Sequence, residues 1–125
     1  MPGDFRDLVA WQESVALVGD VVQLLRQLRG PGSIDLGKQL LRAAESIPAN
    51  IAEGYGRSIG KDFCRFLRIA VGSVAEVESH IVVASQTGRL DQSRAEPVIL
   101  RARRVRALLV GLIKSVERRS RAPIA

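Results

Sequence analysis

Apolar residues recur along this chain at alternating steps of three and four positions, in four separate stretches. Such spacing places side chains on one face of an α-helix, so each stretch predicts an amphipathic helix. The predicted helices cover about residues 7–28, 34–54, 59–87 and 93–120. In the first of them the predicted core-facing stripe consists of Leu8, Trp11, Val15, Val18, Val22 and Leu25.

Glycine and proline residues mark the ends of these helices. The Gly-Pro-Gly segment at 30–32 ends the first helix, the Gly-Tyr-Gly segment at 54–56 ends the second, and Gly88 is a candidate C-cap for the third. Pro48 lies inside the second helix and lacks a backbone donor, so a bend is expected there. Because short loops between long helices favour antiparallel packing, the sequence predicts an all-α, up-down-up-down four-helix bundle in one domain, 1–125.

The composition favours a cytoplasmic location. The chain of 125 residues is 46% hydrophobic and has a single cysteine, so it forms no internal disulfide. It shows no basic segment followed by an apolar stretch at its start and no apolar run of the roughly 18 residues that a membrane span needs. We therefore expect a cytoplasmic protein without a membrane partner.

Positive charge is concentrated in the last third of the sequence. Residues 1–88 hold 9 basic and 10 acidic side chains, whereas residues 89–125 hold 10 basic and 3 acidic ones. The net charge of +6 thus arises from the fourth predicted helix and its flanks. Such asymmetry indicates an acidic partner, of which nucleic acid is the usual example.

The basic residues of the fourth predicted helix have two interpretations. They either keep the bundle soluble or form a surface that binds phosphate, for which the planar guanidinium of arginine is well suited. Since no aromatic residue lies between them for base stacking, the second interpretation favours contact with the RNA or DNA backbone over sequence reading. The candidate nucleic-acid-binding residues are Arg94, Arg101, Arg103, Arg104, Arg106, Lys114 and Arg118.

A polar stripe follows the second predicted helix beside its apolar stripe. It is either a solvated face or a buried or interfacial network, in which Arg42 or Arg57 pairs with Glu53 or with Glu76 of the third helix. Such a network would fix register or assembly more than it would add stability. The residues of this predicted network are Arg42, Asn50, Glu53, Arg57 and Glu76.

The run from Ser46 to Gly54, followed by Gly56 and Arg57, is the most distinctive part of the sequence. Together with Phe5–Leu8, Trp11 and Gln12 before it, and with Phe63, Phe66, Gly72 and Glu76 after it, this run resembles the four-helix-bundle family named after the 23S rRNA intervening sequence. The resemblance covers about residues 5–115. It implies a bundle that assembles as a homopentamer, and it provides no established activity and no agreed catalytic residues.

The sequence offers no arrangement typical of catalysis or metal binding. His80 is the one histidine and Cys64 the one cysteine, and both are interpreted as structural residues. One histidine and one cysteine cannot form a metal-ligand cluster of the usual kind, and no nucleophile–base spacing is visible. We therefore expect a protein without enzymatic activity or cofactor.

Apolar residues outside the main stripes of the first and fourth helices predict that copies of the chain associate with each other. On the first helix these include Val9, Leu17, Val21, Leu24 and Leu28, and a widened helix core is the alternative explanation. Two functions remain open at this stage. The chain is either an oligomeric protein that binds the RNA or DNA backbone, or an adaptor ring that holds a partner protein.

Overall fold

The structure is a computed structural model that describes residues 3–57 and 61–121. Four long helices account for most of it: α1 (Val9–Leu25), α2 (Ser33–Arg57), α3 (Lys61–Gln86) and α4 (Gln92–Arg121). A short 3-10 helix, η1 (Phe5–Asp7), precedes α1. The described residues contain no strand, which confirms the predicted all-α fold. The predicted start of the third helix, at residue 59, lies outside the described residues.

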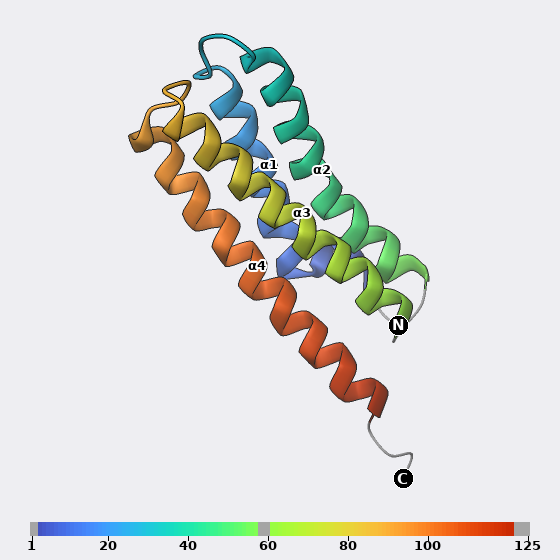
Figure 1. Cartoon of the computed structure of the whole chain (residues 1–125). Helices are drawn as coiled ribbons and strands as arrows, with labels where there is room; N and C mark the ends of the chain where they lie inside the picture. Colours follow the sequence, from blue (N-terminus) through green and yellow to red (C-terminus); the bar gives the residue numbers. More distant parts are fainter. Residues whose placement is uncertain (1–2, 58–60, 122–125) are drawn as a thin grey trace.

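The helices form a closed ring of neighbours. α1 packs on α2 and α4, and α3 packs on α2 and α4. Consecutive helices run in opposite directions (Figure 1). The space between them is filled by aliphatic side chains and Phe63, and the largest fully buried side chains include Leu17, Leu40, Ile47 and Leu109. A core of this kind provides most of the stability of a bundle, because burial of apolar area is the main favourable term.

α1 faces the core with a different stripe from the predicted one. Leu17 and Val21 are fully buried, whereas Val15 is 42% and Val22 is 38% exposed. The predicted stripe was therefore displaced by about one position: three residues placed outside it, Leu17, Val21 and Leu24, are buried, whereas Leu8, Trp11, Val18 and Leu25 within it are partly buried against the core. α1 carries apolar residues on both faces, so the spacing of three and four fitted both stripes equally well.

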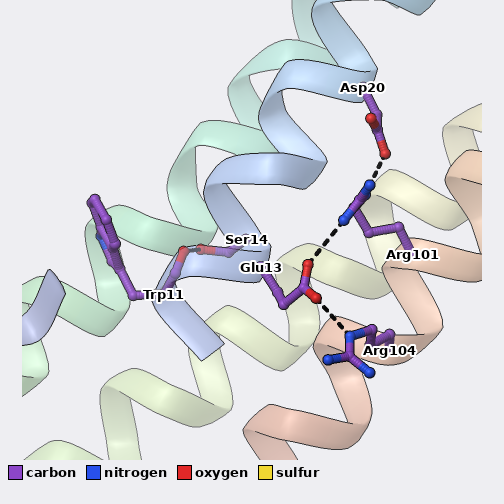
Figure 2. Close-up of polar contacts among 6 residues, drawn as sticks. All are labelled: Trp11, Glu13, Ser14, Asp20, Arg101 and Arg104. Carbon is purple, nitrogen blue, oxygen red and sulfur yellow. Dashed lines mark hydrogen bonds and ion pairs between the residues drawn. The ribbon is translucent and has the colours of Figure 1, made fainter. Parts of the chain in front are cut away.

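The buried stripe of α1 includes a polar residue, Ser14, whose side chain is completely enclosed. Its hydroxyl donates a 2.7 Å hydrogen bond to the carbonyl oxygen of Trp11, one turn earlier (Figure 2). A buried hydroxyl that is satisfied within its own helix loses little by leaving water. Ser14 thus occupies a core position that a search for apolar residues alone would pass over.

The second helix continues through Gly54, where the sequence predicted its end. Gly54 is buried against α3, and a Cβ atom added to it would lie 2.7 Å from the Cβ of Phe66 and 3.1 Å from Cδ1 of Phe63. The glycine thus allows two helices to approach closely, and it does not terminate α2, which ends at Arg57. α2 is also continuous through Pro48, and the bend there remains a prediction.

The loops at one end of the bundle are linked to each other. The backbone N–H of Arg29 donates to the carbonyl oxygen of Arg89 at 3.0 Å, and the Arg29 guanidinium lies 2.9 Å from the carboxylate of Asp91. Gly88 has a φ of +74°, as its predicted place after the end of α3 requires. These contacts fix the start of α4 relative to the end of α1.

Candidate nucleic-acid interface

A network of four charged side chains joins α1 to α4 (Figure 2). Nε of Arg101 lies 2.6 Å from the carboxylate of Asp20, and its NH1 lies 2.9 Å from Glu13. The second oxygen of Glu13 accepts a 2.6 Å hydrogen bond from Nε of Arg104. We call these four residues the α1–α4 clamp. They connect the middle of α4 to the face of α1 that borders the core.

The α1–α4 clamp is partly shielded from water. The side chain of Glu13 is 20% exposed and that of Arg101 is 36% exposed. The hydrogen bond from Arg104, with a further one from Arg101, holds the pKa of Glu13 below its ordinary value. The hydrogen bond to Asp20, with a further one to Glu13, raises the pKa of Arg101. Arg101 is thus held by two acidic partners, and Arg104, whose side chain is 60% exposed, by one.

Glu13 and Asp20 were missed as functional residues by the sequence reasoning. The signal was present, because they lie seven residues apart on one face of α1, opposite two arginines that lie three apart on α4. This spacing indicates ion pairs only when the face of α1 that packs on α4 is known, and the pattern of apolar residues had indicated a different face. The clamp therefore became visible only with the structure.

Two more ion pairs join α4 to α3. Arg103 lies 3.5 Å from Glu78, and Arg68 of α3 bonds to Glu117 of α4 at 2.5 Å. Arg103 remains 64% exposed in this pair, so the contact is loose and largely solvated. Its guanidinium can change partners at little cost, in contrast to that of Arg101.

The other four candidate residues of α4 have no acidic partner within 4 Å among the described residues. Arg94 lies near the start of the helix, Arg106 near its middle, and Lys114 and Arg118 near its end, and all four are exposed. A cation without an intramolecular partner keeps its full charge available to a ligand. The predicted basic surface is therefore divided into residues that hold the bundle together and residues that remain available.

The predicted polar network of α2 is not buried. Arg57 does pair with Glu53, at 3.4 Å, as one of the predicted alternatives proposed. Glu76 instead faces His80, at 3.3 Å, and the exposed Arg42 has no acidic partner among the described residues. Asn50 donates to the carbonyl oxygen of Ser46, within its own helix. Within one chain these contacts favour the solvated-face interpretation, and a role between chains remains a prediction.

Comparison with known proteins identifies the family. The sequence profile of the 23S rRNA-intervening sequence protein family matches residues 6–111. The chain belongs to this family. Among solved structures, it is similar to a protein of unknown function from the S23 ribosomal protein family of Bacteroides thetaiotaomicron, with 25% sequence identity and a TM-score of 0.75. The similarity covers 85% of this chain and 99% of the other. No curated protein sequence matches.

Membership of the 23S rRNA-intervening sequence protein family supports the fold and leaves the activity open. Among the residues that the structure describes, no three His, Cys, Asp or Glu side chains are grouped closely enough to hold a metal ion.

Cys64 is buried, which raises the pKa of its thiol and so lowers its reactivity. In the described parts of the chain, no helix combines the length and the hydropathy needed to cross a bilayer.

Proposed function

We propose that this member of the family is a non-enzymatic, self-assembling helical bundle that binds the phosphate backbone of RNA or DNA. The observation that carries the proposal is the set of exposed cations on α4 that lack an acidic partner among the described residues: Arg94, Arg106, Lys114, Arg118 and Arg119. A nearby phosphate would gain from these charges without breaking an existing ion pair. Contacts of this kind position a protein on a nucleic acid and carry no sequence information.

Self-assembly is proposed from an apolar face on the side of α1 and α2. Val15, Val22 and Ile34 are 42%, 38% and 77% exposed, and Trp11 and Val18 beside them are half-buried. An open groove lined by Leu25, Leu28, Ile34, Gly37 and Leu41 continues this face between the two helices. A second copy of the chain would remove such a surface from water.

The stoichiometry of five rests on the family resemblance alone. We place the candidate contact on α1 and α2, and not on α1 and α4 as the sequence indicated, because three of the α1 residues first assigned to it are buried: Leu17, Val21 and Leu24. Assembly would repeat the cations of α4 in each subunit. Several weak phosphate contacts acting together bind far more tightly than one.

The test is binding of the purified protein to fluorescent RNA and DNA, single- and double-stranded, over a series of salt concentrations. We expect log affinity to fall linearly with log salt, by about 0.9 per phosphate contact on duplex DNA. A protein that shows no nucleic-acid binding at 50 mM salt overturns the proposal. That result favours the adaptor alternative, in which the ring holds a partner protein. Sedimentation equilibrium tests assembly separately, since a mass near 13.6 kDa at micromolar concentration refutes it.

A further inference from the structure

The start of α3 and the end of α4 lie side by side at one end of the bundle. Arg68 pairs with Glu117, and Sγ of Cys64 lies 4.0 Å from the carbonyl oxygen of Ile113. This juxtaposition joins two basic segments that are about 50 residues apart in the sequence. Lys61, Arg65 and Arg68 come from α3, and Lys114, Arg118 and Arg119 from α4; we call these six residues the basic end.

The basic end holds most of the uncompensated charge of the chain. Residues 61–68 and 114–119 contain six basic and two acidic side chains, a net charge of +4 in a chain of +6. At the opposite end, residues 26–38 and 86–96 contain five basic and three acidic side chains, a net of +2. All six members of the basic end are exposed, so their charges face water and any ligand in it.

α4 extends beyond α1 at this end. Glu13, four residues after the start of α1, pairs with Arg104, so the antiparallel α1 begins level with about residue 108 of α4. From there α4 continues to Arg121, roughly 20 Å further at 1.5 Å per residue. η1 does not cover this length, because it contacts α1 and α2 but not α4. Figure 1 shows the end of α4 projecting past the other helices.

Two of the guanidiniums near the basic end are held by an aromatic ring. The carbon of the Arg65 guanidinium lies 4.7 Å from the centre of the Phe66 ring, and that of Arg57 lies 5.5 Å from it. Phe66 is buried, so the ring forms a fixed platform. Stacking limits the rotamers of Arg65, which lowers the entropy lost when it binds a phosphate.

We propose that the juxtaposed α3 start and α4 end form the surface that binds the nucleic-acid backbone. This inference rests on the proposed function and locates it. Along α3, and from Lys114 to Arg118 of α4, the cations lie about one helical turn, or roughly 5–6 Å, apart, on two helices in contact. All of them are exposed and they follow the length of two helices, which suits a chain of phosphates better than a single small anion. Arg101 and Arg104, in contrast, are retained by the α1–α4 clamp.

The test compares two variants that change the net charge equally. The first replaces three cations of the basic end that have no acidic partner among the described residues, as Lys61→Gln, Lys114→Gln and Arg118→Gln. The matched control replaces three exposed cations away from the basic end that have no acidic partner among the described residues. It carries Arg26→Gln, Lys38→Gln and Arg42→Gln. Circular dichroism and sedimentation establish that both variants keep the helical content and the mass of the wild type.

Affinity for a 20-base-pair DNA duplex and for an RNA of equal length is measured at several salt concentrations. Each phosphate contact contributes about 0.9 to the slope of log affinity against log salt. A variant that has lost one contact should therefore bind about 8-fold more weakly than wild type at 0.1 M salt, if the two bind equally at 1 M. The basic-end variant should therefore bind at least about 50-fold more weakly than wild type at 0.1 M, with a salt slope smaller by about 2 to 3. The control should lose less than about 5-fold.

The outcomes separate this inference from the proposed function. Equal loss in both variants means that only net charge matters, and loss in neither means that the phosphates contact other residues; either result overturns the inference while the proposed function stands. Absence of binding by the wild-type protein overturns both. A difference between DNA and RNA affinity that is abolished in the basic-end variant alone would support the inference and would show which nucleic acid fits the surface.

Discussion

The close contact of α2 and α3 at Gly54 can be tested by adding one methyl group. In Gly54→Ala the new Cβ would lie 2.7 Å from the Cβ of Phe66, 3.1 Å from Cδ1 of Phe63 and 3.4 Å from the carbonyl oxygen of Phe63. The first of these atoms moves only with the backbone of α3, so the helices must separate. Overpacking of this kind costs about 1–3 kcal/mol.

Alanine also favours the helix, and this gain must be subtracted. Gly→Ala inside a helix stabilises it by about 1 kcal/mol. Because the contact at Gly54 involves backbone-anchored atoms, the upper part of the overpacking range applies, and the net effect is a destabilisation of about 1–2 kcal/mol. For a chain of 125 residues this corresponds to a fall of roughly 3–8 °C in Tm. Gly72→Ala is the matched control, since a Cβ at Gly72 in α3 meets nothing within 4 Å.

The assay is thermal and urea unfolding followed by circular dichroism, at one protein concentration because assembly would shift the midpoint. Gly72→Ala should raise the free energy of unfolding by about 0.5–1 kcal/mol, and Gly54→Ala should lower it. If both substitutions stabilise the protein to the same extent, α2 and α3 are not in close contact at Gly54. The conclusion that Gly54 allows close packing of α2 on α3 would then be wrong.

Three further predictions concern the α1–α4 clamp and the apolar face. Replacing Arg101 and Arg104 with Gln should lower Tm by roughly 2–4 °C and weaken nucleic-acid binding less than the basic-end variant does. Since the pKa of Glu13 is lowered in the folded state, its contribution is present above its ordinary pKa of 4.5 and lost as pH falls through the folded value. Below about pH 4.5 the Tm of wild type should therefore fall more steeply than that of Glu13→Gln. Val15→Ser with Val22→Ser should reduce the sedimentation mass while the helical content stays unchanged.

Much of the fold followed from the sequence. The periodicity of apolar residues placed four helices, and the end of α4 and the glycine after α3 were within about one residue of the structure. These features depend on local patterns, which a sequence displays directly. The predicted end of α2 was wrong because it depends on a contact with another helix, which no local pattern shows. A glycine that permits close packing and a glycine that ends a helix look alike until the neighbouring helix, with Phe66, is in place.

The candidate site followed from the sequence only in part, and the reason lies in α1. Its apolar residues form two adjacent stripes, and both stripes have the spacing of a buried helix face. What distinguishes them is charge: Glu13 and Asp20 border the buried stripe and meet Arg101 across the interface with α4. Placing the other stripe inward would remove these carboxylates from the arginine and leave charges of both signs unpaired. The interaction that distinguishes the core face of α1 therefore also engages Arg101, which the sequence placed among the ligand-binding candidates. The orientation of α1 and the contacts of Arg101 depend on each other, so neither could be predicted alone.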